Sequence, residues 1–124
     1  MLKTGLKNSV EITVTETLSA KSMGSGSLSV LATPALIAGM ENVCMNCVQP
    51  FLEEGFTTVG TKVNVSHIAA TGLGDTVTYV CELTETDRRR LVFTVSAFDS
   101  KGKVGEGTHE RFIVDAQRFM SKLG

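Results

Sequence analysis

Hydrophobic and polar residues alternate along five separate stretches of this sequence. Near the start, Val10, Ile12 and Val14 alternate with polar residues, which is the period of a half-buried strand. The same period recurs in residues 58–68, 76–84, 91–97 and about 104–114. Turn-forming residues such as Gly, Asp and Ser separate the last four stretches, as hairpin connections require. The pattern therefore predicts five strands, of which the last four are antiparallel neighbours.

A helical pattern separates the first strand from the other four. Thr33 followed by Pro34 predicts a helix start, with Thr33 as the N-cap and Pro34 as the first helical residue. Gly55 ends the pattern. The apolar residues that recur at helical spacing are Leu36, Met40, Val43, Cys44, Cys47, Val48 and Phe51. Before this helix, residues 19–29 are rich in Gly and Ser and predict a mobile loop or lid.

The order of these elements predicts an α+β architecture. One long helix carries an apolar stripe of roughly 140°, so an antiparallel sheet of about five strands must wrap around it. The tail, residues 115–123, predicts a short helix capped by Asp115. A chain of 124 residues is expected to form one domain spanning residues 1–124.

Composition excludes several function classes. A net charge of -1 argues against a nucleic-acid binder with a broad basic surface. The most apolar stretch, residues 28–40, is too short for a membrane span, and no secretory signal is expected at the start. Three cysteines make a poor disulfide framework, so a cytoplasmic location is expected.

Glu41 is the first candidate for chemistry. It lies at the margin of the helix's apolar stripe, where partial desolvation raises the pKa of a carboxylate and makes it a better base or nucleophile. The alternative is a glutamate whose carboxylate reaches solvent from the edge of the stripe.

His67 and Thr33 are two further candidates. His67 shares a strand face with Val63 and Val65, so it points toward the core or the mouth of a pocket, where histidine serves as a general acid or base. The alternative is a buried neutral histidine bonded to backbone. The Thr33 hydroxyl could cap the helix and also meet a substrate.

Two other motifs favour structural roles. Cys44 and Cys47 have CxxC spacing but fall within the apolar stripe, so small core residues are the better interpretation, and no metal site is expected. The run Arg88–Arg90 lies at a hairpin and predicts a solvated turn, with phosphate binding as the alternative. Gly105 and Gly107 indicate a bulge or a close backbone approach within a strand.

Taken together, four segments resemble the fluoroacetyl-CoA thioesterase family of hotdog-fold acyl-CoA thioesterases. They are Ala32-Thr33-Pro34, Glu41, residues 58–71 (TVGTKVNVSHIAAT) and residues 105–112 (GEGTHERF). The resemblance covers residues 30–119 or so, and it implies a hotdog fold, in which a sheet wraps one long helix.

This resemblance also implies an activity and a site. It implies hydrolysis of a short-chain acyl-CoA to a free acid and CoA, with Thr33, Glu41 and His67 as the catalytic residues. Gly60 and Arg111 would lie near the acyl end of the substrate. Residues 22–28 contain no aromatic side chain where the fluoroacetate-specialised enzyme has a bulky apolar lid, so other short acyl groups are expected.

The resemblance further implies a homodimer or a dimer of dimers, in which Thr33 and Glu41 of one chain face His67 of the other. Coenzyme A enters as part of the substrate, and no separate cofactor is implied. Two alternatives remain: a non-hydrolytic protein that binds acyl-CoA or a small apolar acid, and a hydratase or dehydratase acting on acyl thioesters.

Overall fold

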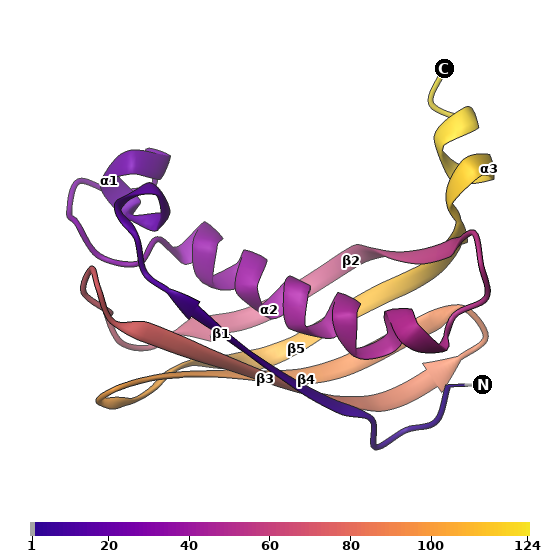
Figure 1. Ribbon diagram of the computed structural model, residues 1–124, viewed down its shortest axis with the longest axis horizontal. Coiled ribbons are helices and arrows are strands. Elements are labelled where there is room, and N and C mark those ends of the chain that lie inside the picture. Colours follow the sequence, from indigo (N-terminus) through magenta and orange to yellow (C-terminus); the bar gives the residue numbers. More distant parts are fainter. Residues whose placement is uncertain (1) are drawn as a thin grey trace.

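Five antiparallel strands form one curved sheet around a central helix (Figure 1). The computed structural model describes residues 2–124. The strands are β1 (Lys7–Thr13), β2 (Phe56–His67), β3 (Thr76–Asp87), β4 (Arg90–Asp99) and β5 (Gly102–Asp115). Their order in the sheet is β1-β3-β4-β5-β2, which leaves β1 and β2 as the two edges. The predicted α+β architecture and the five strands are confirmed, with strand ends displaced by a few residues.

The central helix, α2 (Thr33–Val48), packs its apolar stripe into the curve of the sheet. Leu36, Met40 and Val43 are all 1 % exposed or less. A short 3-10 turn, η2 (Gln49–Phe51), continues the helix up to the bend before β2. Gly105 of β5 lies under the helix, where an added Cβ would come within 3.0 Å of Leu36, which confirms the predicted close approach.

The start of α2 differs from the prediction by one residue. Ala32 is the N-cap and makes no side-chain capping bond, while Thr33 is the first helical residue and Pro34 the second. The Thr33 hydroxyl does not cap the helix because it is hydrogen-bonded to His67 instead. The residue that carries this hydroxyl is exposed in the first turn of the helix.

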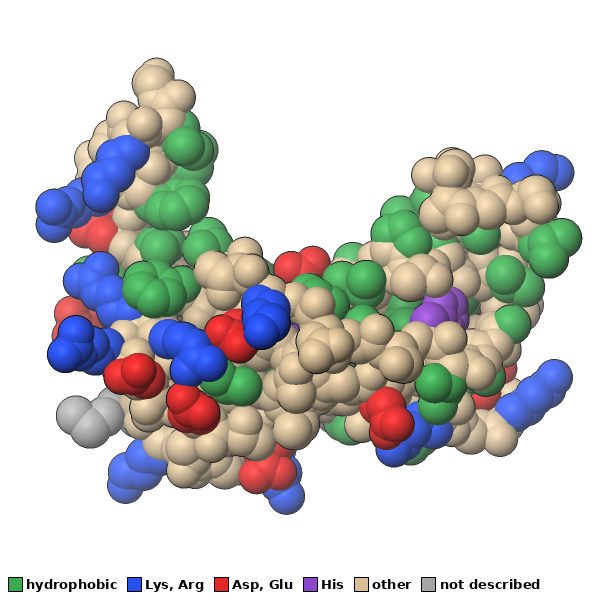
Figure 2. Space-filling model, turned by 180° about the vertical axis from the view of Figure 1, so that it is seen from behind, with side chains coloured by type: hydrophobic (Ala, Val, Ile, Leu, Met, Phe, Trp, Pro, Cys, Tyr) green, Lys and Arg blue, Asp and Glu red, His purple; other side chains and the backbone are tan. Residues whose placement is uncertain are grey.

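Two short helices project on the same side of the molecule at opposite ends (Figure 1). At one end, η1 (Glu16–Leu18) and α1 (Ala20–Met23) lie in and just before the Gly- and Ser-rich stretch, where only a loop was expected. The Ser19 hydroxyl caps α1 by accepting from the Ser22 N–H. At the other end stands α3 (Ala116–Ser121), and Asp115 caps it as predicted. A hollow separates the two ends in the space-filling view (Figure 2).

The remaining structural predictions concern cysteines and arginines. Cys44, Cys47 and Cys81 are free and at most 5 % exposed, which confirms their place in the core. Arg90 forms ion pairs with Glu85 and Glu110, so the three consecutive arginines do not act as one group. Among residues 2–124, no helix has both the length and the apolar character needed to cross a membrane.

Candidate active site

Thr33 and His67 form the first part of the site. Thr33 begins α2 and His67 ends β2, and Thr33 Oγ1 lies 2.8 Å from His67 Nδ1. Both residues line a cavity of about 340 Å³, together with residues of the α1 segment and Ile68. His67 therefore lies at the mouth of a pocket, as its place in the sequence pattern predicted.

The protonation of His67 follows from its surroundings. Burial lowers the pKa of the imidazole below its ordinary value, so the ring is neutral near pH 7. Its Nε2 atom is buried and has no hydrogen-bond partner among residues 2–124. If the Thr33 hydroxyl donates to Nδ1, the proton of the neutral ring resides on Nε2. The Nε2–H of His67 is then available to donate a hydrogen bond to a group from outside this chain.

Glu41 forms the second part of the site, in the middle of α2. Its Oε2 lies 3.9 Å from the Arg111 Nη1 atom, and its side chain is 41 % exposed. An added Cβ at Gly60 would come within 2.6 Å of the same oxygen, so a larger residue there would displace this carboxylate. The expected desolvation is therefore incomplete: the carboxylate reaches solvent and is balanced by a buried guanidinium.

Arg111 is held by a network of hydrogen bonds in the core. It is 5 % exposed, and its Nε donates to the Thr58 hydroxyl at 2.7 Å while Nη2 donates to the Thr58 carbonyl at 2.9 Å. The Nη1 group lies 3.1 Å from His109 Nε2. This fixed geometry directs one edge of the guanidinium toward Glu41. The predicted pair of Gly60 and Arg111 is thus brought together beside Glu41 by the pairing of β2 with β5.

His109 supports this network but was assigned no role from the sequence. It is 1 % exposed, and its Nδ1 lies 2.8 Å from the Lys62 carbonyl oxygen. Since a carbonyl only accepts, Nδ1 carries the proton and Nε2 accepts from Arg111. Burial and the neighbouring Arg111 lower the pKa of His109, which keeps it neutral. Its position two residues before Arg111 in one strand was the signal that both side chains face the helix.

The two parts lie apart within one chain. Glu41 lies eight positions after Thr33 in α2, a rise of roughly 12 Å, and the cavity beside His67 does not include Glu41. The expected division, with Thr33 facing His67 of another chain, is wrong because these two side chains are hydrogen-bonded within one chain. We call Thr33 with His67 the edge half-site and Glu41, Gly60, His109 and Arg111 the core half-site.

The site contains a carboxylate, a neutral histidine and a hydroxyl, which is a set suited to acyl transfer. Within residues 2–124, no three His, Cys, Asp or Glu side chains are grouped to hold a metal ion. The fold and these residues together define a hotdog-fold acyl-CoA thioesterase.

Comparisons with known proteins identify the family. The profile of the fluoroacetyl-CoA-specific thioesterase family matches residues 14–117. The fluoroacetyl-CoA thioesterase of Streptantibioticus cattleyicolor is 40 % identical over 94 residues, which are 76 % of this chain and 68 % of that protein. A solved structure of the fluoroacetyl-CoA thioesterase FlK superposes with a TM-score of 0.94, at 31 % identity over 99 % of this chain and 96 % of the other. A mutant of FlK in complex with fluoroacetate and CoA gives a TM-score of 0.91, at 31 % identity over 95 % of this chain and 99 % of the other. The chain therefore belongs to the fluoroacetyl-CoA-specific thioesterase family.

Proposed function

We propose that this protein hydrolyses a short-chain acyl-CoA at two equivalent sites in a homodimer. In each site, Glu41 from one subunit faces Thr33 and His67 of the partner subunit. The observation that carries this proposal is the separation of the half-sites within one chain, with an unused donor on His67 and an exposed carboxylate on Glu41. Membership in the family supports the thioesterase activity itself.

The exposed edge of β2 supports this arrangement. It is a long edge strand, and such an edge can pair with another chain. An antiparallel pair of β2 strands centred between Val63 and Asn64 sets Gly60 opposite His67 of the partner subunit. Glu41 touches the space at Gly60, and Thr33 touches His67, so this pairing unites both half-sites.

The two projecting ends support the same pairing. Antiparallel edges bring α3 of one subunit beside α1 of the partner. Apolar side chains of α3 and the tail after it are largely exposed, with Met120 62 % and Leu123 71 % exposed, and so are Met23 and Leu28 of the other end, at 44 % and 67 %. Helices as short as α3 are unstable without packing, so a partner surface accounts for these side chains.

The mechanism follows from the protonation states. Glu41 accepts a proton from water as the water oxygen attacks the thioester carbonyl carbon, or the carboxylate attacks that carbon itself. In the partner subunit, Thr33 holds His67 so that the Nε2–H of the ring donates a hydrogen bond to the carbonyl oxygen or the departing sulfur. In the first route, the C–S bond then breaks and the proton held by Glu41 passes to the sulfur, giving a carboxylic acid and the CoA thiol. In the second route, breaking the C–S bond releases the CoA thiolate and leaves a mixed anhydride on Glu41, and its hydrolysis by water gives the acid, restores the carboxylate and supplies the proton for the thiolate. A single turnover in water carrying a heavy oxygen isotope separates the two roles of Glu41, because only direct attack places enzyme oxygen in the product.

The segment before α2 supports short acyl groups other than fluoroacetyl. Residues 22–28 are exposed and contain no aromatic side chain. A panel of short acyl-CoAs assayed for thiol release tests this choice, and it also tests the binding-protein alternative, which requires no release from any of them. The free, buried cysteines support a reducing, cytoplasmic setting.

Complementation between inactive variants tests the shared site. Glu41→Gln and His67→Ala are each expected to be inactive, yet a refolded equal mixture should recover about a quarter of wild-type activity. Half of the dimers are then mixed, and each mixed dimer has one intact site of two. No recovery in dimers shown by sedimentation to have mixed would contradict a shared site.

A second mixture serves as the matched control. Thr33→Ala and His67→Ala remove two members of the same half-site, so their mixture should remain inactive. The mixture of Thr33→Ala with Glu41→Gln should recover like the first one. Recovery in the Thr33 and His67 mixture would place these residues in different sites and overturn the proposed pairing.

A further inference from the structure

His109 uses both nitrogens of its ring to join the edge strand β2 to Arg111. Its Nδ1–H donates to the Lys62 carbonyl at 2.8 Å, and its Nε2 accepts from Arg111 Nη1 at 3.1 Å. The ring of Phe93, from β4, stacks on the imidazole with 6.5 Å between the ring centroids. The two hydrogen bonds and the stacked ring hold the imidazole in one orientation and one tautomer.

The anchor for this ring comes from an irregularity in β2. The register between β2 and β5 shifts between Gly60 and Lys62. Backbone carbonyls of a regular strand bond to the neighbouring strand, whereas a bulge turns part of the backbone out of that pattern. Here the Lys62 carbonyl accepts a hydrogen bond from the His109 ring. The bulge thus provides an acceptor for a histidine on the helix side of the sheet.

The partners of Arg111 in the core are neutral. Its Nε and Nη2 donate to Thr58, and its Nη1 donates to an imidazole that burial keeps neutral by lowering the pKa of His109. Among residues 2–124, Glu41 is the one carboxylate within ion-pair distance of the guanidinium, at 3.9 Å. A carboxylate in place of the imidazole would pair with the guanidinium and compete with Glu41 for its charge. A neutral acceptor fixes Nη1 and leaves the positive charge to Glu41.

Gly60 marks how closely these groups meet. A Cβ added there would lie 2.6 Å from Glu41 Oε2, 3.2 Å from His109 Cε1 and 3.4 Å from Arg111 Nη1. The carboxylate, the imidazole and the guanidinium therefore border one small space. A rotation of the guanidinium in that space would move its positive charge relative to the Glu41 oxygen that reacts.

We infer that His109 is a positioning residue for Glu41, because it holds Nη1 of Arg111 toward the carboxylate. This role rests on the proposed function, in which Glu41 is the reacting group. The imidazole acts through Arg111 and touches no substrate atom. Its loss should therefore slow the reaction step and leave substrate binding unchanged.

Two amide variants separate the two hydrogen bonds of the ring. The amide of His109→Gln reaches the place of Nε2, where its oxygen accepts from Arg111, but it offers no donor to Lys62. The shorter amide of His109→Asn stays near the place of Nδ1, where its nitrogen donates to Lys62, but it leaves Arg111 Nη1 without an acceptor. Each variant keeps one hydrogen bond and loses the other, so their urea midpoints should fall by similar amounts.

The rates of these two variants should differ although their stabilities do not. His109→Asn should lower kcat about tenfold, because displacement of a reacting group is costly, and should leave KM within about twofold of wild type. His109→Gln should restore kcat to within about threefold of wild type. Val77→Ala is the matched control for stability: it truncates a side chain of β3 that is 0 % exposed, so it should lower the urea midpoint and leave kcat unchanged. Equal kcat in the Asn and Gln variants would mean that the ring only supports the fold, and the positioning role would be wrong.

Nuclear magnetic resonance of the Arg111 guanidinium tests the geometry without any substrate. Wild type and His109→Gln should show separate Nη1 and Nη2 signals, because both ends of the group are held, and His109→Asn should show one averaged signal. If wild type hydrolyses no acyl-CoA, the proposed function fails, and these spectra alone decide whether His109 holds Arg111. Separate signals in His109→Asn would mean that Thr58 is sufficient to hold the guanidinium, which would overturn the role of His109.

Discussion

The two half-sites are built in opposite ways. The core half-site is fixed before any substrate arrives: Arg111 is 5 % exposed, makes two hydrogen bonds to Thr58, and receives support from a buried histidine. The edge half-site consists of one hydrogen bond between Thr33 and His67 at an exposed strand end. This contrast teaches that one chain fixes the orientation of its carboxylate, while the Nε2 atom of His67 has no hydrogen-bond partner among residues 2–124. Substitutions in the two half-sites should therefore differ in how they change the reaction rate and the free energy of unfolding.

Removing the carboxylate should give the largest effect on rate. Glu41→Gln keeps the shape of the side chain but cannot accept a proton or attack carbon. We expect kcat to fall by about 10²–10⁴-fold, the usual contribution of such a group. The free energy of unfolding should change by less than about 1 kcal/mol, because this partly exposed ion pair contributes little. Steady-state kinetics and urea unfolding measure the two quantities, and a variant with full activity would refute the assignment.

The next prediction compares how much each half-site contributes to the free energy of unfolding. Arg111→Gln leaves the Thr58 and His109 acceptors unpaired in the core, and we expect a loss of about 3 kcal/mol. Thr33→Val, at the exposed helix start, should cost less than about 0.5 kcal/mol. Urea unfolding of both variants makes the comparison. Equal losses would mean that the edge half-site is as firmly built as the core one.

Most of the fold could be predicted because it depends on local pattern. The alternation in each strand and the helical spacing after Pro34 place the elements within a few residues of where they occur. Residue type and family resemblance also singled out Thr33, Glu41 and His67 as candidate catalytic residues. The arrangement of these residues was not, because it depends on contacts between distant segments. Thr33 was expected to cap the helix, and only the position of His67 at the end of β2 gives its hydroxyl another partner.

Other site features escaped prediction for the same reason. His109 and Arg111 follow the period of a strand, but the pattern does not say that a bulge between Gly60 and Lys62 brings the Lys62 carbonyl to the imidazole. The charge balance at Glu41 likewise depends on β5 crossing under the middle of α2. The position of Glu41 on the helix predicted that its carboxylate is desolvated, whereas Arg111 of the neighbouring strand β5 supplies an opposite charge.

A smaller effect concerns space in the core half-site. Gly60→Ala places a methyl group within 2.6 Å of Glu41 Oε2, so the carboxylate must move. We expect kcat to fall about tenfold, because small displacements of a reacting group are costly. Gly72→Ala is the matched control, since an added Cβ there meets nothing within 4 Å. Unchanged kcat in Gly60→Ala would show that the carboxylate has freedom to shift without loss.

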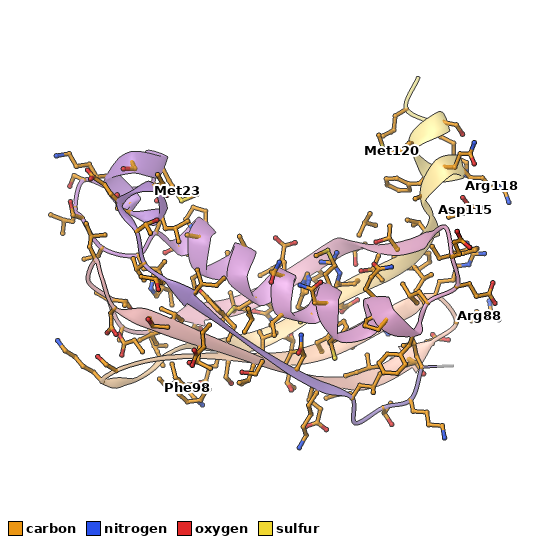
Figure 3. All side chains as sticks on the ribbon, in the orientation of Figure 1. Met23, Arg88, Phe98, Asp115, Arg118 and Met120 are labelled. Carbon is orange, nitrogen blue, oxygen red and sulfur yellow. The ribbon has the colours of Figure 1, made fainter. Side chains whose placement is uncertain are left out.

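Contact between the two ends of different subunits can be tested by crosslinking. Met23 and Met120 lie at opposite ends of one chain (Figure 3), so a disulfide between cysteines at these positions must join two subunits. Oxidised Met23→Cys/Met120→Cys should run as a covalent dimer on a non-reducing gel. Each single variant should stay uncrosslinked, as should Met23→Cys/Arg118→Cys, because Arg118 points away from Met120 on α3 (Figure 3). A dimer in sedimentation that never crosslinks would leave the shared site intact but remove α3 from the contact.

Lowering the pH should act on the two half-sites through different histidines. We expect these to be the smallest of the predicted effects. Burial lowers the pKa of both His67 and His109 below the ordinary value of about 6.5. Protonated His67 cannot accept from Thr33 at Nδ1, so kcat/KM should fall only when pH drops below that lowered pKa. In the unfolded chain His109 binds a proton at about pH 6.5, whereas in the folded protein it stays neutral until pH reaches its lowered pKa. Its contribution to the free energy of unfolding is therefore present above about pH 6.5 and is lost progressively as pH falls below that value.

Two variants show which histidine is responsible for each effect. His109→Gln should flatten the dependence of unfolding free energy on pH below about 6.5, because its ionisable group is gone. Thr33→Val should move the acid limb of kcat/KM to higher pH, because the hydroxyl that stabilises the neutral ring of His67 is lost. Activity profiles and urea unfolding between about pH 5 and 8 measure both. Activity that falls as pH rises through the pKa of His67 would mean that His67 works as an imidazolium, and the hydroxyl would then accept rather than donate.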